Sequence, residues 1–290
     1  MKITKKLASL PGRPKDGHKG MFGRLLIVGG SENMIGAPVL AGTAALRSGA
    51  GLVQIAMPKT VLAAALSISP ELIGLGLDQA NTRELLDAAG AADAIVVGPG
   101  MGQQPAALER LKALVRLDKP IVLDADALNM LAAEKKWPSD LAARAVLTPH
   151  PGEMKRLLNL LPASELKALG SLSLFPADDE TRLKIASAMA QLTAQTIVLK
   201  GHRTVITDGA LAYFNNSGDS SLSKAGSGDV LSGVLGCLLA QKMTPFDAAT
   251  VAVHLHGLAG QIAGEAWGLR SPLARDVINA IPPAIARLRW

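Results

Sequence analysis

The sequence contains little of what several common kinds of protein need. Its 290 residues include one cysteine, Cys237, so no disulfide can form within the chain, which favours a reducing compartment. Four Phe, three Trp and one Tyr offer few rings on which nucleic-acid bases could stack. The most apolar windows, residues 61–77 and 230–240, are either broken by Pro70 and Glu71 or too short to span a bilayer. These shortages predict a cytoplasmic chain that binds neither nucleic acid nor membrane.

Familiar nucleotide-binding motifs are missing as well. No G-x-x-x-x-G-K-[ST] segment occurs, which excludes a P-loop protein, and the glycine-rich segment 98–102 continues into Gln103 without completing G-x-G-x-x-G. No catalytic-triad signature stands out. His254 and His256 are two residues apart and would point to different faces of a helix, so we expect no metal site built by this pair. A nucleotide would have to bind through another arrangement.

The basic charge is concentrated at one end of the chain. Six basic residues and one aspartate lie in the first twenty residues and account for most of the net charge of +6. The remaining body is nearly neutral, and a hydrophobic content of 49% is enough for a large core. We therefore predict a basic N-terminal arm over residues 1–18 and a single domain over residues 19–290. The arm precedes every motif described below, so we expect it to be dispensable for chemistry.

Short apolar runs that end in glycine or polar turns alternate with helical segments. This alternation predicts an α/β fold of three layers, with a mostly parallel sheet between helices. Residues 204–214 place Asp208-Gly209 between two apolar runs, which predicts a hairpin and an antiparallel edge. In such sheets ligands collect beyond the carboxyl ends of the strands. The predicted strands are residues 25–28, 52–57, 94–97, 121–123, 146–147 and 197–199.

Three other segments complete the secondary-structure prediction. Residues 245–264 are rich in alanine and predict a long helix. Residues 273–288 form an amphipathic segment that Pro282-Pro283 should interrupt. Residues 161–179 have the weakest pattern and predict a loop or short helices.

The stretch from Leu222 to Gly233 carries the strongest signal for a site. It sets Gly226 and Gly228 directly before an apolar helical run, where the first amides of the helix have no internal partner. Such a helix start binds phosphate under the positive end of the helix dipole. Asp229 would repel that phosphate unless it handled a proton or a metal, so it is our candidate catalytic base. The alternative is that Asp229 caps the helix.

Polar residues at predicted strand ends are candidates for the rest of the site. His150 and Glu153 follow one strand in a loop suited to gripping a polar ligand, or else they are a loop histidine and a first-turn glutamate. Lys200 follows another strand and either reaches a phosphate as a flexible point charge or is solvated. Asp124 and Asp126 follow a third strand, and the turn decides which of them faces the site.

Taken in order, these residues are similar to the motifs of a known family. The chain resembles the ADP-dependent NAD(P)H-hydrate dehydratase family, whose members have the ribokinase-like fold, over about residues 19–285. The resemblance rests on several ordered motifs and is therefore specific. These motifs are Lys19-Gly20, Gly29-Gly30-Ser31, Gly36-Ala37-Pro38, Gly98-Pro99-Gly100-Met101-Gly102, Leu123-Asp124-Ala125-Asp126-Ala127-Leu128-Asn129, Thr148-Pro149-His150-Pro151-Gly152-Glu153, Lys200-Gly201 and Gly226-Ser227-Gly228-Asp229-Val230-Leu231.

The resemblance implies repair of a damaged nicotinamide nucleotide. The S hydrate of NADH or NADPH would be dehydrated by this hydro-lyase while its co-substrate ADP gives AMP and phosphate, with Mg²⁺ bridging the phosphates in a homotetrameric protein. The implied catalytic residue is Asp229, which also belongs to the implied hydrate-binding set of Ala37, Gly100, Gly102, His150 and Asp229. The implied nucleotide-binding set is Lys200, Gly201, His202, Arg203, Thr204, Gly226, Ser227 and Gly228.

Two features differ from the usual family pattern. Relatives commonly have Gly-Thr-Gly-Asp where this chain has Gly226-Ser227-Gly228-Asp229, a change that keeps the hydroxyl and both glycines. Many relatives also carry a fused epimerase domain ahead of this one. Because only about twenty residues precede the motifs, we expect no epimerase activity.

Two other functions fit the same residues. A small-molecule kinase of this fold would phosphorylate a vitamin-precursor alcohol by the same first step and stop there. A nucleotide-sensing protein would bind without turnover, although Asp229 argues against this alternative. The preference for ADP or ATP, the preference for NADH or NADPH hydrate and the assembly are left open by the residues alone.

Overall fold

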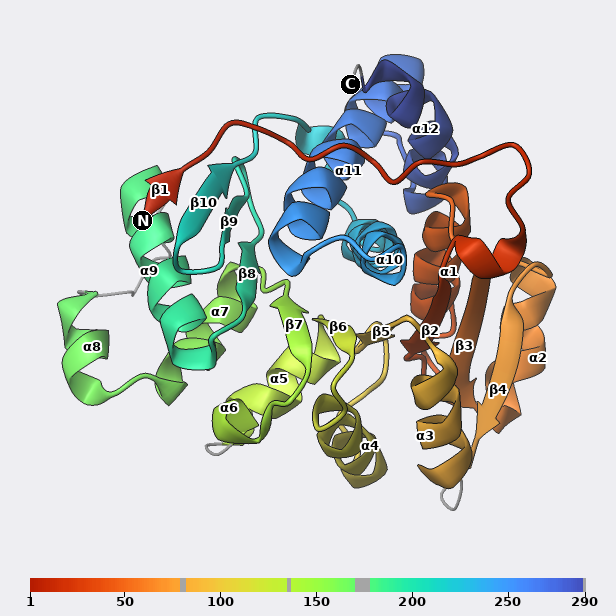
Figure 1. The fold of residues 1–290 in the computed structure, drawn as a ribbon, viewed down its shortest axis with the longest axis horizontal. Coiled ribbons are helices and arrows are strands. Elements are labelled where there is room, and N and C mark those ends of the chain that lie inside the picture. The colour runs from red at the N-terminus through yellow and green to blue at the C-terminus, as the bar shows by residue number, and fades with distance from the viewer. Residues whose placement is uncertain (79–81, 135–136, 170–177, 289–290) are drawn as a thin grey trace.

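One sheet forms the centre of the fold in this computed structural model, which describes residues 1–78, 82–134, 137–169 and 178–288 (Figure 1). Its ten strands lie in the order β1-β10-β9-β8-β7-β6-β5-β2-β3-β4. Neighbouring strands are parallel except at β9, which is antiparallel to β8 and β10. The strands are β1 (Lys2–Ile3), β2 (Arg24–Val28), β3 (Leu52–Pro58), β4 (Ile73–Leu77), β5 (Ala94–Val97), β6 (Pro120–Leu123), β7 (Arg144–Leu147), β8 (Thr196–Leu199), β9 (Val205–Thr207) and β10 (Leu211–Phe214).

The sheet predicted from the sequence is confirmed, including the antiparallel region near one edge. β9 and β10 form the predicted hairpin, and Gly209 in its turn has a φ of +89°. The Asp208 carboxylate holds this turn by accepting hydrogen bonds from the amides of Ala210 (2.9 Å) and Leu211 (2.7 Å). The two-residue strand β1 then joins the outside of β10.

Helices cover both faces of the sheet and form the outer two of three layers (Figure 1). One face carries α1 (Gly36–Arg47), α2 (Lys59–Ile68), α10 (Ser227–Ala240), α11 (Pro245–Trp267) and α12 (Ala274–Arg287). The other face carries α3 (Thr82–Ala91), α4 (Pro105–Val115), α5 (Asp126–Ala133), α6 (Trp137–Asp140), α7 (Pro151–Leu157) and α9 (Asp179–Thr193). The remaining described helical segments are α8 (Ala163–Ala168) and the 3₁₀ turns η1 (Lys19–Met21), η2 (Leu158–Leu160) and η3 (Ser220–Leu222).

The strands are apolar on both sides because each side faces a helical layer. In β2, Leu25 and Ile27 belong to the core under α10, whereas Leu26 and Val28 belong to the core under the opposite helices. This alternation is the two-residue period of a strand, and it explains why the sequence shows continuous apolar runs here. The carboxyl ends of the strands remain for polar residues.

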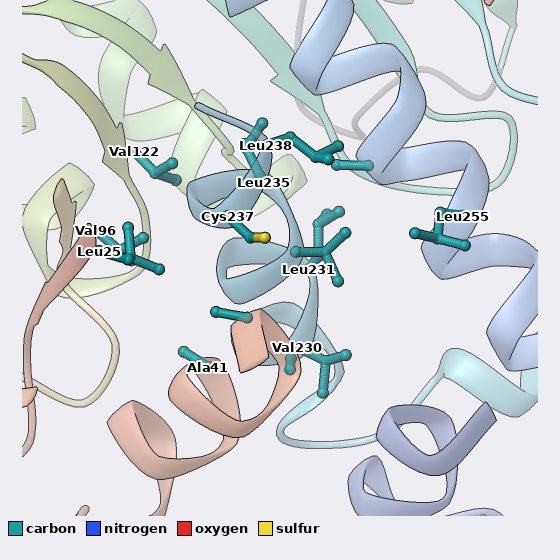
Figure 2. Packing of buried hydrophobic residues seen from close by; sticks show 14 of the residues in the cluster. Leu25, Ala41, Val96, Val122, Val230, Leu231, Leu235, Cys237, Leu238 and Leu255 are labelled. Carbon is teal, nitrogen blue, oxygen red and sulfur yellow. The ribbon is translucent and has the colours of Figure 1, made fainter. Parts of the chain in front are cut away.

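Helix α10 is the most deeply enclosed helix of its layer. Gly233 brings it against α1, since a Cβ at that position would lie 2.0 Å from the carbonyl oxygen of Ala41. Gly236 brings it against the sheet, where a Cβ would lie 2.5 Å from Cγ2 of Val96. These close approaches fix the position of the helix start above the strand ends. Figure 2 shows the surrounding residues, which are Leu25, Ala41, Val96, Val122 and Leu255, with Val230, Leu231, Leu235, Cys237 and Leu238 of α10 itself.

The C-terminal segment differs from its prediction. The expected interruption at Pro282-Pro283 is absent, and α12 runs through both prolines from Ala274 to Arg287. Proline removes hydrogen bonds to the preceding turn, but Ile281 and Ala284 beside the pair are buried in the core. Packing against the core therefore holds a helix that local propensity would break. The predicted helix over residues 245–264 is confirmed as α11.

The prediction of a loop or short helices over residues 161–179 is met in part. Helix α8 is one such short helix, whereas residues 170–177 lie outside the described residues. No helix in the described ranges is long and apolar enough to cross a membrane.

The basic N-terminal segment lies along the domain. From β1 the chain crosses the side of α11 and α12 and reaches η1 (Figure 1). Leu7 and Leu10 pack against the core, and the Arg13 guanidinium lies 3.9 Å from the centre of the Phe22 ring. Arg13 also donates a hydrogen bond of 2.7 Å to the carbonyl oxygen of Gly49. The division into an arm and a domain remains a prediction.

We predict that Gly233→Ala lowers the free energy of unfolding by about 3 kcal/mol, because its methyl group would collide with the α1 backbone. The control is Gly90→Ala in α3, where no atom lies within 4 Å of the added carbon. That change should leave stability the same or raise it by up to about 1 kcal/mol. Urea unfolding of the two variants measures the difference. Equal stabilities would contradict the close packing of α1 and α10.

Candidate active site

The start of α10 presents two free backbone amides. Gly226 precedes it with a φ of +87°, and the helix has no side-chain cap. The amide of Ser227 donates to the Lys224 carbonyl (3.3 Å) and that of Val230 to the Gly226 carbonyl (3.1 Å). Among the described residues, the amides of Gly228 and Asp229 have no acceptor. The helix start therefore has two amides that remain available to a ligand.

Asp229 lies half-buried in the first turn of α10. Its carboxylate accepts no hydrogen bond from the described backbone, so the structure gives no support to the cap interpretation. Burial, with a further contribution from the charge of Asp124, raises the pKa of Asp229 to about 7, although Lys200 opposes the rise. A carboxyl group with this pKa can accept a proton and release it near neutrality.

A buried ion pair lies beneath this turn. Lys200 Nζ is 2.8 Å from Oδ1 of Asp124, and the two side chains are 19% and 2% exposed. Ser232 of α10 donates a hydrogen bond of 2.7 Å to the other oxygen of Asp124. Burial alone would raise the pKa of Asp124, but Lys200 and these hydrogen bonds outweigh it and the pKa is lowered. Burial likewise opposes the charge of Lys200, yet Asp124 and Glu153 raise its pKa.

Glu153 and His150 extend this cluster to the start of α7. Glu153 Oε2 is 3.8 Å from Lys200 Nζ and accepts a hydrogen bond of 2.8 Å from the His150 amide. His150 Nδ1 in turn accepts hydrogen bonds from the amides of Gly152 (3.0 Å) and Glu153 (3.3 Å), which completes a capping box. Burial raises the pKa of Glu153 to about 7 and, with Lys200 and Arg156, lowers the pKa of His150. The first-turn glutamate considered from the sequence therefore also contacts the site lysine.

The two aspartates of the turn after β6 have different partners. Ala125 between them has a φ of +51°, a conformation that is uncommon for residues other than glycine. Asp124 faces Lys200, while Asp126 accepts a hydrogen bond of 2.8 Å from the Gly102 amide. A Cβ at Gly100 would lie 3.0 Å from Cβ of Ala37, so the predicted hydrate-binding residues of α1 and of the loop after β5 are neighbours.

Hydrogen bonds from helix α9 hold the loop after β8 in place. The buried Arg182 of α9 donates to the carbonyl oxygens of His202 and Arg203, the latter at 3.2 Å. Thr204 closes the loop with a hydrogen bond of 3.0 Å to the Gly201 carbonyl.

Two side chains of this loop that were predicted to bind the nucleotide do not contact the cluster of Asp124, Glu153 and Lys200. The Arg203 guanidinium pairs with Asp179 of α9 at 2.8 Å, and His202 is exposed. The Lys200 side chain does reach the start of α10, since its Nζ lies 3.7 Å from the position of a Cβ added at Gly228.

Three residues of the site escaped the sequence interpretation. Ser232 follows Asp229 by three positions, so helical spacing could have placed both on one face. Arg182 and His256 gave no such signal, because each reaches the site from a helix distant in sequence. His256 of α11 is buried, and its Nε2 lies 3.2 Å from Oγ of Ser227.

The donors in the described residues do not fit a metal cage built by the protein. They include no group of three His, Cys, Asp or Glu side chains that could hold an ion. Asp124, the most buried carboxylate of the site, is already paired with Lys200. A metal here would need most of its ligands from elsewhere.

Comparison with known proteins gives consistent results. The family model for NAD(P)H-hydrate dehydratase matches residues 25–283. An ADP-dependent (S)-NAD(P)H-hydrate dehydratase of Neisseria meningitidis is 38% identical over 287 residues, which cover 96% of this chain and 88% of that protein. A bifunctional NAD(P)H-hydrate repair enzyme of Moorella thermoacetica is 38% identical over 97% of this chain. The chain spans about half (52%) of that bifunctional relative.

Solved structures agree with the sequence matches. An ADP/ATP-dependent NAD(P)H-hydrate dehydratase of Bacillus subtilis, co-crystallised with ATP/Mg²⁺, has a TM-score of 0.80 and 30% identity over 97% of this chain and 95% of that one. A ribokinase-like superfamily protein of Enterococcus faecalis has a TM-score of 0.79 and 26% identity over 96% of this chain and 92% of that one. The ribokinase-like fold is thus confirmed, and the chain belongs to the NAD(P)H-hydrate dehydratase family.

Proposed function

We propose that the chain is a hydro-lyase that dehydrates the S hydrate of NADH or NADPH and converts ADP to AMP and phosphate. The observation that carries this proposal is the half-buried Asp229 carboxyl beside the free amides of Gly228 and Asp229. A base and an anion-binding helix start at one point are what transfer of a phosphoryl group to an alcohol requires. The family relationship supports the hydrate as that alcohol.

The first step is transfer of the terminal phosphoryl group of ADP. Asp229 takes the proton from the ring hydroxyl of the hydrate. The hydroxyl oxygen attacks the terminal phosphorus of ADP, and the bond between that phosphorus and the oxygen that stays with AMP breaks. The free amides of Gly228 and Asp229 donate to the phosphoryl oxygens, where negative charge has to be stabilised. Lys200 lies next to this turn and offsets part of that charge.

The second step is elimination. Hydroxide leaves poorly, whereas the phosphate ester formed in the first step leaves as inorganic phosphate. The lone pair of the ring nitrogen expels it, and the adjacent ring carbon then loses a proton to restore the double bond of the dihydropyridine. The products are NADH or NADPH, AMP and phosphate, so each turnover consumes one ADP.

The residue assignments of the two ligands form part of the proposal. The hydrate is assigned to the start of α1, to the loops after β5 and β7 and to Asp229 of α10, and the nucleotide to the loop after β8 and the start of α10. The hydrate contacts are Ala37, Gly100, Gly102, His150 and Asp229. The nucleotide contacts are Lys200, Gly201, His202, Arg203, Thr204, Gly226, Ser227 and Gly228.

The surroundings of the reaction are proposed as well. Mg²⁺ would enter with the nucleotide phosphates, which agrees with the lack of a fitting donor set in the described residues. We also propose that the protein is a cytoplasmic homotetramer that binds neither nucleic acid nor membrane. The basic arm over residues 1–18 takes no part in the chemistry.

The proposal is tested by incubating the purified protein with the S hydrate of NADH and ADP. We expect the absorbance of reduced nicotinamide to recover, with one AMP and one phosphate formed per NADH, and no recovery when the nucleotide is omitted. A stable phosphorylated product without absorbance would indicate a kinase. Nucleotide binding without any product would indicate a sensor.

Replacing Asp229 by Asn separates the base from the cap. Asn caps a helix about as well as Asp but cannot take the hydroxyl proton. We expect turnover to fall by on the order of 10²–10⁴, while the fold and ADP binding persist. Turnover, circular dichroism and ADP titration measure the three quantities. A folded Asp229→Asn protein with near-parental turnover would exclude proton transfer by this residue.

The pH dependence gives an independent test of the base. Because Asp229 must be ionised to accept a proton and its pKa is raised to about 7, kcat/KM should rise with pH and level off above about pH 7. Glu153 has a pKa of about 7 as well, so Glu153→Gln is the control and should keep this rise. A profile that is flat between about pH 5.5 and 8, or one that becomes flat in Glu153→Gln, would contradict the assignment to Asp229.

A further inference from the structure

Ser227, one of the proposed nucleotide contacts, forms a buried polar pair with His256, to which the proposed reaction gives no role. Ser227 is the first residue of α10, and its Oγ lies 3.2 Å from Nε2 of His256 on α11. Both residues are buried, with exposed fractions of 8% and 7%. The pair therefore connects the start of α10 to a second helix.

The other histidine of α11 has a different environment. His254 is half-buried, and its Nδ1 lies 3.5 Å from the Tyr213 hydroxyl at β10. It also lines a cavity of about 560 Å³ between the N-terminal segment, the middle of α11 and the C-terminal end of α12. His254 thus shares the helix of His256 but lies away from the start of α10, which makes it a matched control.

The imidazole of His256 is neutral near physiological pH. Burial, with a smaller contribution from Lys200, lowers the pKa of His256 to about 4, although an interaction with the Ser227 backbone opposes the fall. A neutral imidazole carries one N–H and one lone pair, so its hydrogen bond with a hydroxyl can run in either direction. The direction decides what the hydroxyl offers to a ligand.

An anion at the start of α10 favours one of the two directions. If Ser227 donates to Nε2, its oxygen lone pairs face the anion and repel it. If Nε2–H donates to Ser227 Oγ, the hydroxyl hydrogen is free to point at the anion, beside the free amides of Gly228 and Asp229. Hydrogen bonds aligned in this way polarise one another and strengthen the last donor.

We propose that His256 is a positioning residue, which donates its Nε2–H to Ser227 Oγ and so directs the Ser227 hydroxyl hydrogen at the phosphoryl group bound by the start of α10. This inference rests on the proposed phosphoryl transfer for its kinetic consequence. Its structural content, the tautomer of one imidazole with a nucleotide bound, can be measured whether or not the hydrate is the substrate.

The first experiment is nitrogen-15 NMR of the histidine side chains with saturating ADP. The chain has five histidines, and the spectrum of His256→Gln assigns the signal of His256. We expect a neutral imidazole with its proton on Nε2 from pH 6 to 8, since the pKa of about 4 lies below this range. A proton on Nδ1, or a cationic ring, would overturn the proposal even if the protein were to act on another substrate.

The second experiment measures kcat for the hydrate and the affinity for ADP in variants of the pair. His256→Leu should lower kcat by about tenfold to a hundredfold, which is less than the 10²–10³ lost with a direct donor to the reacting oxygen. The Kd for ADP should change by less than about threefold, because two amide donors remain. His256→Gln should recover most of kcat, since its amide nitrogen reaches the position of Nε2 and can donate. The control, His254→Gln, should keep the parental kcat.

A double-mutant cycle shows whether His256 acts through Ser227. If it does, Ser227→Ala combined with His256→Leu lowers kcat no further than Ser227→Ala alone. Additive losses would overturn the proposal, as would a His256→Gln protein that folds, binds ADP and is no better than His256→Leu. A parent protein that makes no NADH from its hydrate contradicts the proposed function instead, and the tautomer measurement then decides the role of His256.

Discussion

The buried ion pair between Lys200 and Asp124 is the interaction on which the geometry of the site depends. Each partner follows a different strand, and Ser232 attaches the pair to α10, so one cluster joins the sheet to the helix. Breaking such a pair from one side leaves a charge uncompensated at a cost of about 3–5 kcal/mol. The pair therefore constrains where the strand ends and the start of α10 can lie, and Asp229 takes its position from that constraint.

The position of α10 depends equally on two glycines, whose lack of a side chain allows close packing. Gly233 lets the helix touch the backbone of α1, and Gly236 lets it lie directly on the Val96 side chain of β5. A helix packed this closely cannot shift by an ångström without collisions. The free amides of Gly228 and Asp229 are consequently held at a fixed height above the strand ends, and a preorganised donor pair needs no reorganisation when charge develops on a ligand.

Sequence reasoning succeeded where a local pattern has one physical meaning. Apolar runs that end in glycine or polar turns predicted six of the parallel strands, and Gly226 to Asp229 predicted the start of α10, because each signal lies within a few adjacent residues. It failed where distant segments meet. The contacts of Arg182 with the loop after β8 and of His256 with Ser227 join residues 20 to 29 positions apart, and no periodicity encodes them. The predicted interruption at Pro282-Pro283 was wrong for the opposite reason, because tertiary packing overrode the strong local preference of proline against a helix.

In the proposed reaction, the charges around Lys200 also relate nucleotide binding to the strength of Asp229 as a base. Asp229 and Glu153 both have a pKa raised to about 7, mainly by burial, and the charge of Lys200 opposes the rise in each. A phosphate at the free amides of α10 adds negative charge beside the same lysine, which raises the pKa of Asp229 further. A carboxylate with a higher pKa holds a proton more firmly, so an ionised Asp229 becomes the stronger base once the phosphoryl group to be attacked is in place. At lower pH the same shift protonates Asp229 and removes the base, so the arrangement favours the reaction only when nucleotide binding and ionisation of Asp229 coincide.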